Sequence, residues 1–424
     1  MTWLNRRNGT LFAEEVSLER IAERYGTPTF VYSKSSIVEA FREFKQAAQG
    51  RNVLICYALK ANSNLAIVDL LRAEGAGFDI VSGGELKRVL AVGGDPAKTV
   101  FSGVGKSLDE INEALRVGVH CFNVESISEL HRLSKCASAM GKVANISLRV
   151  NPNVDPKTHP YISTGLKQNK FGVAHEQALA TYQLAASLPS LKIAGIDCHI
   201  GSQITELSPF LAALDKVLEL VDALHERGID LHHLDLGGGL GIDYGGETPP
   251  SRAALFEALF ERIDRHTIAR HCQLMFEFGR SLVGNAGALL SRVEYLKPAS
   301  PGQEDGKAFA IVDAAMNDLL RPTLYDAYHG VTEVKQRPGI PATVYDIVGP
   351  VCESGDWLAK SRPLKLAEGD LIAIQSAGAY GMAMSSNYNT RARAAEVMVD
   401  GDAVHLVRQR EALDDLFASE STLG

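Results

Sequence analysis

The 424-residue sequence contains no long apolar run and no block of basic residues. A membrane-spanning helix needs about 20 predominantly apolar residues, and no uncharged apolar stretch of that length occurs. The beginning, MTWLNRRNGTLFAEE, also lacks the apolar core of a signal peptide. The formal net charge of -8 is spread along the chain, which argues against a nucleic-acid or membrane-surface protein. We therefore expect a cytoplasmic protein.

Paired cysteines and metal-binding spacings are absent as well. The six cysteines stand singly, without a CxxC pair, which argues against a zinc site or a disulfide framework. Four of them lie in apolar runs, where cysteine usually acts as a small hydrophobic residue. Cys352 differs because it lies in GPVCESGD, which favours a loop. No HExxH sequence occurs, so the sequence predicts no bound metal.

From residue 53 onward, short runs rich in Val, Ile and Phe alternate with amphipathic stretches of helical periodicity. The runs predict eight strands, over 53–59, 77–81, 99–102, 120–124, 144–150, 192–200, 232–237 and 274–278. Helices are predicted between them, for example over 107–118, 126–141 and 208–228, the last with Leu211, Leu214, Leu218, Val221 and Leu224 on one face. This alternation predicts a TIM-type (β/α)8 barrel, with an open doubly wound sheet as the alternative.

The pattern changes after Arg280, where helical periodicity gives way to extended runs over 287–296, 307–314, 342–349 and 370–377. The stretch 396–407 predicts a hairpin around its Asp-Gly-Asp turn, and a turn-rich loop is expected over 298–306. We therefore expect the barrel over 28–281 and a β-rich, sandwich- or barrel-like C-terminal domain over 282–424. Residues 1–27 are expected to pack on that second domain.

Lys60 follows an apolar run in CYALKAN, residues 56–62. Because a buried lysine without a partner is rare, a side chain that reaches the surface is the simpler interpretation. The alternative is a lysine in a pocket, where desolvation lowers its pKa and makes it a nucleophile. Polar residues follow all eight predicted strands at the end where barrels place their active sites. They are Lys60, Asp79 with Ser82, Gly83 and Gly84, Ser102, Asn123, Arg149, His199 with Gly201 and Ser202, Asp235 with Gly237, Gly238 and Gly239, and Glu277 with Arg280.

Each of these residues also has a structural interpretation, such as a core histidine for His199. The triple glycine at 237–239 suits a phosphate, although a flexible turn is the alternative. It is not a dinucleotide fingerprint, because Ile242 stands where a glycine would be needed, and SGVGKS is not a P-loop for a similar reason at Val100. A lysine, a phosphate site, a carboxylate and a histidine around one cavity favour pyridoxal 5'-phosphate, with its aldehyde on Lys60.

Motifs along nearly the whole chain resemble those of a known family. They are YALKAN (57–62), FDIVSGGEL (78–86), NKFG (169–172), HIGSQI (199–204), LGGGLGI (236–242), EFGR (277–280), RPTLYDAYH (321–329), GPVCESGD (349–356) and GAYGMAMSSNYN (378–389). Together they are highly specific, and they resemble the alanine-racemase-like, fold type III pyridoxal-phosphate decarboxylases, and within them the diaminopimelate decarboxylases. In EFGR, Phe278 replaces the proline that the family usually has between Glu277 and Arg280.

The resemblance implies a role for each matching residue. It implies that Lys60 forms the Schiff base, that His199 stacks on the ring and that Cys352 is the proton donor. Cofactor contacts are implied for Lys60, His199, Ser202, Gly238, Gly239, Glu277, Gly279, Arg280 and Tyr380, with Glu277 at the pyridine nitrogen. Substrate contacts are implied for Arg280, Arg321, Tyr325, Glu353 and Tyr380. The implied reaction is decarboxylation of meso-2,6-diaminopimelate to L-lysine, in a homodimer where the Cys352 segment reaches the partner's site.

Three alternatives remain. An ornithine or arginine decarboxylase of the same fold is disfavoured because those enzymes resemble CDGLD where this chain has GPVCES. An amino acid racemase would need a base on each face of the ring. A non-catalytic cofactor-binding homologue should have lost Lys60 or Cys352, and this chain has both. Neither a nucleic acid nor a membrane is expected as a partner.

Overall fold

The computed structural model describes residues 3–165, 169–299 and 306–424, so most of the loop predicted over 298–306 lies outside it. The chain divides into two compact units. The first, named the sheet unit, contains Met1–Glu39, Asp243–Glu247 and Leu282–Gly424. The second, named the barrel unit, contains Ala40–Ile242 and Thr248–Ser281.

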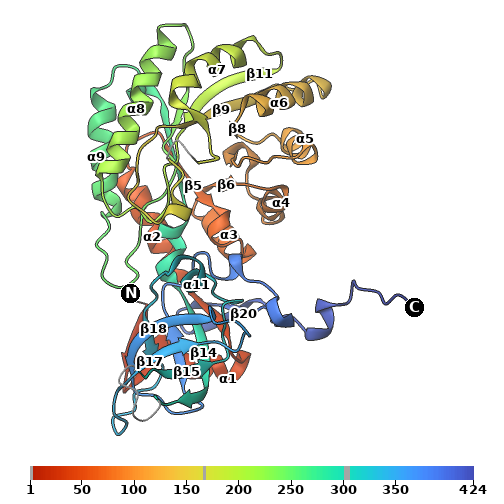
Figure 1. Cartoon of the computed structure of the whole chain (residues 1–424). Helices are drawn as coiled ribbons and strands as arrows, with labels where there is room; N and C mark the ends of the chain where they lie inside the picture. Colours follow the sequence, from red (N-terminus) through yellow and green to blue (C-terminus); the bar gives the residue numbers. More distant parts are fainter. Residues whose placement is uncertain (1–2, 166–168, 300–305) are drawn as a thin grey trace. The chain divides into compact units, whose positions relative to one another are not determined.

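Eight parallel strands form a closed ring in the barrel unit (Figure 1). The ring runs through β9, β11, β12, β13, β5, β6, β7 and β8, and a pairing of β8 with β9 closes it. The strands are β5 (Val53–Ala58), β6 (Gly77–Ile80), β7 (Thr99–Phe101), β8 (Cys121–Val124), β9 (Ala144–Asn151), β11 (Leu191–Asp197), β12 (His233–Asp235) and β13 (Gln273–Phe278). A two-residue strand, β10 (Val173–Ala174), pairs beside β9. The predicted (β/α)8 barrel is confirmed, and the open sheet is excluded.

Helices lie outside this ring, as Figure 1 shows. They are α2 (Lys34–Ala47), α3 (Leu65–Ala73), α4 (Gly83–Ala91), α5 (Leu108–Val117), α6 (Ile127–Ala139), α7 (His175–Ser187), α8 (Ser208–His225) and α9 (Arg252–Arg265). Local sequence sets their ends: α5 begins at a capping box of Ser107 and Glu110 and ends at Gly118, whose φ of 79° is left-handed. Within the described part of the chain, no helix is long and apolar enough to cross a membrane.

The buried face of α8 differs from the predicted one. Leu214, Val221 and Leu224 are buried as expected, but Leu211 and Leu218 are only half-buried. Phe210, Ala213, Val217 and Leu220 complete the buried face instead. At 3.6 residues per turn these positions form a broader stripe than a single row of leucines, and that stripe covers the barrel.

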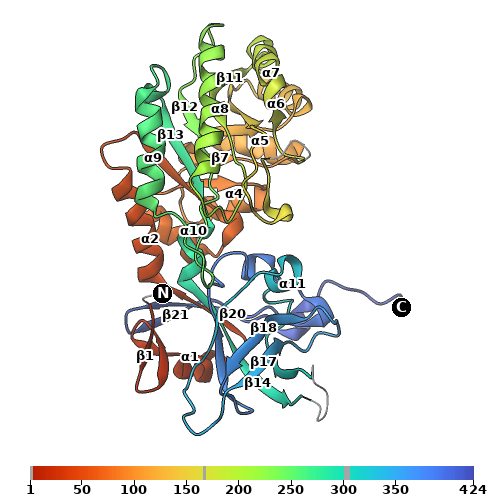
Figure 2. The same cartoon turned by 60° about the vertical axis from the view of Figure 1, so that its left-hand side comes forward.

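The sheet unit is built on a mixed sheet in the order β18, β17, β15, β14, β4, β20 and β21, with β19 pairing to β14 and β16 (Figure 2). The strands are β4 (Thr29–Ser33), β14 (Gly287–Lys297), β15 (Ala308–Val312), β16 (Val331–Glu333), β17 (Thr343–Val348), β18 (Trp357–Leu364), β19 (Leu371–Ile374), β20 (Ala395–Asp400) and β21 (Ala403–Arg408). The hairpin predicted over 396–407 is confirmed, because β20 and β21 are antiparallel neighbours. The β-rich character predicted for this part of the chain is confirmed as well.

The N-terminal segment of the sheet unit forms a small sheet and a helix. Its elements are β1 (Leu4–Arg7), β2 (Thr10–Ala13), β3 (Val16–Ser17) and α1 (Leu18–Tyr25), and two short helices, α10 (Arg280–Val283) and α11 (Arg321–Tyr325), occur later in the chain. Trp3, Leu11 and Ile21 are buried in one core with Leu290 of β14 and Val397 of β20. This burial anchors the first strands to the main sheet of the unit.

Phe278, which stands where the family usually has a proline, lies in a cluster of aromatic rings. It ends β13, where it pairs with Tyr57, and only 1% of it is exposed. Its ring stacks on Phe44 of α2, with 4.0 Å between the ring centroids, and on Phe276, at 5.4 Å. Phe256 of α9 joins the same cluster. The phenylalanine therefore adds aromatic packing between the barrel wall and two of its helices, which a proline would not provide.

We predict that Phe278→Ala lowers the free energy of unfolding by about 3–5 kcal/mol, because it removes a buried ring and leaves a cavity. Phe278→Leu, which fills most of that volume, should cost about 1–2 kcal/mol. The matched control is Phe417→Ala, since Phe417 is 50% exposed and should change stability by less than about 0.5 kcal/mol. Denaturant unfolding measures all three, and equal losses for Phe278→Ala and Phe417→Ala would contradict the packing role.

Candidate active site

Lys60 lies directly after β5 rather than on it. The strand ends at Ala58, one residue earlier than predicted, and Lys60 lies in a single 3-10 turn, Leu59–Ala61. Its Nζ lies 3.0 Å from Oδ2 of Asp79, whose side chain is completely buried at the end of β6. The Lys60 side chain is 35% exposed. The lysine therefore points at a buried carboxylate at the barrel mouth instead of extending freely into water.

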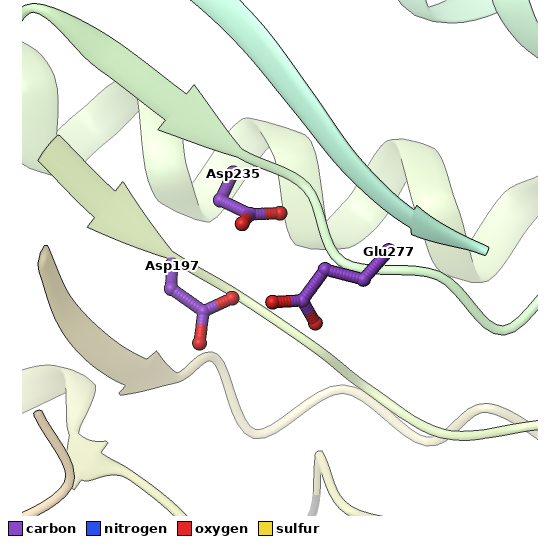
Figure 3. A group of neighbouring side chains, drawn as sticks. All are labelled: Asp197, Asp235 and Glu277. Carbon is purple, nitrogen blue, oxygen red and sulfur yellow. The ribbon is translucent and has the colours of Figure 1, made fainter. Parts of the chain in front are cut away.

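Three more carboxyl groups meet at the ends of neighbouring strands. Asp197 ends β11, Asp235 ends β12 and Glu277 lies near the end of β13, and Figure 3 shows their side chains directed at one another. One oxygen from each lies within 4.8 Å of the others, and all three are buried. Such a group could hold a cation, a cationic ring nitrogen or shared protons. Asp197 was not predicted from the sequence. It stands two residues before His199, and because alternate residues of a strand face the same side, its inward direction could have been expected.

The surroundings of Glu277 combine burial, neighbouring negative charge and neutral donors. Its Oε1 accepts hydrogen bonds from Ser102 Oγ at 3.2 Å and from Asn123 Nδ2 at 3.1 Å. Burial raises the pKa of Glu277 well above its usual value, and Asp235 and Asp79 raise it further. A protonated pyridine nitrogen beside this carboxyl group would supply the missing positive charge, so the residues present fit that part of a pyridoxal cofactor.

The glycine loop after β12 approaches other backbone closely. A Cβ on Gly238 would lie 2.0 Å from the carbonyl oxygen of Glu277, and one on Gly239 would lie 2.3 Å from that of Gly201. Gly239 also has a φ of +100°, which other residues rarely adopt. Glycine is therefore required by space at both positions and by conformation at Gly239, and such glycine-rich loops are typical phosphate sites.

His199 is held by the same loop. Its Nδ1 accepts a hydrogen bond from the backbone N–H of Gly238 at 3.1 Å. Burial lowers the pKa of His199 well below its usual value, and the positive charges of Lys60 and Arg149 lower it further. The ring is therefore neutral at pH 7 and carries its proton on Nε2, because Nδ1 is the acceptor. A neutral flat ring suits stacking against a cofactor.

Arg280 and Ser202 form a second polar pair in the barrel unit. The Nη2 of Arg280 donates to Ser202 Oγ at 2.9 Å, and Arg280 is only 4% exposed. Gly279 allows the close approach of this turn, since a Cβ there would lie 2.9 Å from the Cβ of Ala61. The structure thus brings together Lys60, His199, Ser202, Gly238, Gly239, Glu277, Gly279 and Arg280 within one unit, at the ends of barrel strands.

Arg149 has a buried partner that the sequence did not reveal. Its Nη1 lies 3.1 Å from Oε1 of Glu125, whose other oxygen accepts the backbone N–H of Gly172 at 2.8 Å. The guanidinium also lies 4.9 Å from the ring centroid of Phe171. Glu125 therefore connects the NKFG segment to the barrel. In the sequence, the only sign of this role is that Glu125 directly follows the strand predicted over 120–124.

The other predicted site residues, Arg321, Tyr325, Cys352, Glu353 and Tyr380, belong to the sheet unit. Arg321 is 4% exposed and lies over the rings of Tyr244 and Tyr325, at 5.1 and 5.6 Å. Tyr380 has a φ of 56°, a strained conformation that is common at functional sites. Cys352 lies in a loop, as predicted, and is exposed in this chain.

Comparisons with known proteins agree with these features. The family described as pyridoxal-dependent decarboxylase, pyridoxal binding domain, matches residues 34–284. A diaminopimelate decarboxylase from Pseudomonas aeruginosa is 57% identical over 100% of both chains. Among solved structures, diaminopimelate decarboxylase from Helicobacter pylori complexed with L-lysine is 42% identical, covers 95% of this chain and 98% of its own, and has a TM-score of 0.89.

The enzyme of the same name from M. jannaschii has a TM-score of 0.93 at 38% identity and covers 99% of this chain and 98% of its own. The identity extends over both units, so the similarity is not limited to the barrel. The resemblance noted in the sequence motifs is confirmed. The chain belongs to the family of pyridoxal-dependent decarboxylases and, within it, to the branch of the diaminopimelate decarboxylases.

Proposed function

We propose that this protein removes CO2 from meso-2,6-diaminopimelate to give L-lysine, the last step of lysine biosynthesis, with pyridoxal 5'-phosphate as cofactor. The observation that carries the proposal is the pairing of Lys60 with the buried Asp79, at the end of a barrel where three more buried carboxyl groups meet. It occurs in a chain that is 57% identical to a diaminopimelate decarboxylase over its whole length.

Each polar group of the barrel unit has a place in this proposal. Lys60 holds the cofactor aldehyde, and Glu277 lies at the pyridine nitrogen, where its anionic form is stabilised by the ring's positive charge. His199, neutral and fixed by Gly238, packs against the ring. When bound, the cofactor supplies an aldehyde for the substrate amine and a ring that accepts the electron pair left by departing CO2.

We propose that the loop of Gly238 and Gly239 binds the phosphate of the cofactor, and that Ser202, Gly279 and Tyr380 contribute to its binding. The loop supports this assignment because only glycine fits its close approach to Glu277 and Gly201, and backbone N–H groups of glycine-rich loops bind phosphates. Arg280 reaches Ser202, which places its charge next to the same group.

Recognition of the distal end of the substrate determines specificity. Diaminopimelate carries a second amino acid group, so the enzyme needs cations for a carboxylate and an anion for an ammonium group. Arg280, Arg321 and Tyr325 are proposed to bind that carboxylate, and Glu353 the ammonium group. Two nearly fully buried arginines support this assignment, since a planar guanidinium binds a carboxylate through two hydrogen bonds.

The substrate of an ornithine or arginine decarboxylase has no distal carboxylate for these arginines to bind. A non-catalytic homologue is disfavoured because Lys60 and Cys352 are both present. Cys352 is proposed as the proton donor that completes the reaction after CO2 has left. We place the enzyme in the cytoplasm, as a homodimer.

The reaction itself is tested by incubating the purified enzyme separately with meso-diaminopimelate, ornithine, arginine and lysine, and measuring CO2. We expect kcat/KM to be about 30- to 150-fold higher for diaminopimelate than for the other three amino acids. This factor corresponds to about 2–3 kcal/mol for a charge-assisted contact. The Lys60→Ala variant supplies the background rate. Faster turnover of ornithine or arginine would contradict the proposal.

The shared-site homodimer predicts complementation between two inactive variants. Lys60→Ala and Cys352→Ala are unfolded and refolded together, so that a mixed dimer holds one site with both residues intact. Random pairing should restore about a quarter of wild-type activity, because about half of the dimers are mixed and each has one working site of two. The exposed thiol of Cys352 in the single chain supports this arrangement.

The control for this experiment refolds each variant alone, which should give no activity. Native gels with one variant carrying a tag show whether mixed dimers form. If mixed dimers are present and the mixture stays as inactive as its parents, Lys60 and Cys352 of the same chain serve one site.

A further inference from the structure

Asp235 is a buried carboxyl group to which the proposed mechanism assigns no role. It ends β12, and none of its surface is exposed. Its Oδ1 accepts the backbone N–H of Gly237 at 2.9 Å, the first glycine of the loop proposed to bind phosphate. Figure 3 shows its carboxyl group beside that of Glu277, and one oxygen of each lies within 4.8 Å of the other. Asp235 therefore lies between the two groups that would hold opposite ends of the cofactor.

The second oxygen of Asp235 has no donor. Among the described residues, none gives a hydrogen bond to Asp235 Oδ2 or to either carboxyl oxygen of Asp197. Glu277, by contrast, accepts from Ser102 and Asn123. A buried carboxylate oxygen without a donor costs free energy, which is relieved when that oxygen carries a proton and donates it to a neighbouring carboxylate.

Charge balance leads to the same conclusion. The cations near the cluster are already paired: Lys60 with Asp79, and Arg149 with Glu125 at 3.1 Å and less closely with Asp197 at 3.8 Å. The pyridine nitrogen of the cofactor would balance Glu277. Among the described residues, at most one cation, the more distant Arg149, then remains to balance the negative charges of Asp197 and Asp235. The thiols of Cys56 and Cys121 add no charge, because burial raises their pKa values well above the usual range.

We propose that Asp235 is a positioning residue that carries a proton at neutral pH and donates it in a hydrogen bond to Glu277 while accepting the N–H of Gly237. One side chain would thereby fix both the carboxylate at the pyridine nitrogen and the start of the phosphate loop. Burial raises the pKa of Asp235 to about 7, although its hydrogen bonds with Gly237, Glu277 and Asn123 lower it. The positive ring nitrogen beside Glu277 would keep Glu277 anionic, which leaves the proton to Asp235. Asp197 and Glu277 have raised pKa values too, so the three groups titrate together.

The inference rests on the proposed place of Glu277 at the pyridine nitrogen. It is tested by measuring the dissociation constant of pyridoxal 5'-phosphate and the absorption spectrum of the bound cofactor. Asp235→Asn keeps an acceptor for Gly237 and a donor for Glu277, so its dissociation constant should stay within about threefold of wild type. Asp235→Leu keeps the size but loses both hydrogen bonds, so binding should weaken at least about tenfold.

A matched control and a second variant make the result decisive. Asp95→Asn changes an aspartate that also accepts a backbone N–H at 2.9 Å, from Ala97, but lies at the other end of the barrel strands, and it should bind like wild type. Where Asp235→Leu does not fold, Asp235→Ala replaces it. The spectrum of Asp235→Asn should match that of wild type at pH 7.

Three results would overturn the inference. Asp235→Asn binding as weakly as Asp235→Leu would mean that Asp235 acts as an anion. Wild-type binding by Asp235→Leu would mean that it positions nothing. A metal ion present in equal amount to the holoenzyme, and lost in Asp235→Asn, would mean that the carboxyl groups bind a cation. Glu277→Gln separates these results from the proposed function: if this variant leaves both affinity and spectrum unchanged, the proposed place of Glu277 is wrong.

Discussion

Burying Asp79, Asp197, Asp235 and Glu277 at one end of a barrel is costly unless each negative charge is balanced or neutralised. Lys60 balances Asp79, and Arg149 balances Glu125 and approaches Asp197. What remains is a cluster of buried carboxyl groups near a lysine amine and a glycine loop. A flat ring with a positively charged nitrogen, a phosphate on one side and an aldehyde on another satisfies these demands together, which is why the cofactor follows from the electrostatics and not from the fold alone.

The fold supplies the geometry for this arrangement. Parallel strands in a closed ring direct all their C-terminal ends to the same side, so residues more than 200 positions apart in sequence, such as Lys60 and Glu277, meet at neighbouring strands. The neutral donors Ser102 and Asn123 come from the opposite part of the ring and fix Glu277 across it. Phe278 then anchors the end of β13 in aromatic packing, one residue beyond the carboxyl group that must be held still.

Much of this could be predicted from the sequence, because the spacing of apolar residues predicts the strands and the ends of those strands locate the polar residues of the site. Each of the eight barrel strands was identified, and strand ends located Lys60, His199, Asp235 and Glu277. The strands β4 and β18 were not predicted: the first precedes residue 53, where the alternating pattern begins, and the second interrupts its apolar positions with Lys360, Arg362 and Pro363. Asp197 and Glu125 were missed because their importance lies in contacts with distant segments, which no local pattern encodes. The packing of Phe278 likewise depends on Phe44, more than 200 residues away.

The central claim is that Lys60, and no other lysine, carries the aldehyde of pyridoxal 5'-phosphate. It is tested most directly by reducing the holoenzyme with borohydride, digesting it and locating the modified peptide by mass spectrometry. Lys106 is the informative competitor, since it is also buried at the strand ends but is already bonded to Glu129 and to two backbone carbonyls. The account predicts the pyridoxyl group on the peptide that contains Lys60, and its loss in Lys60→Ala. A modified Lys106, or no modified lysine in an enzyme that still releases CO2, would contradict it.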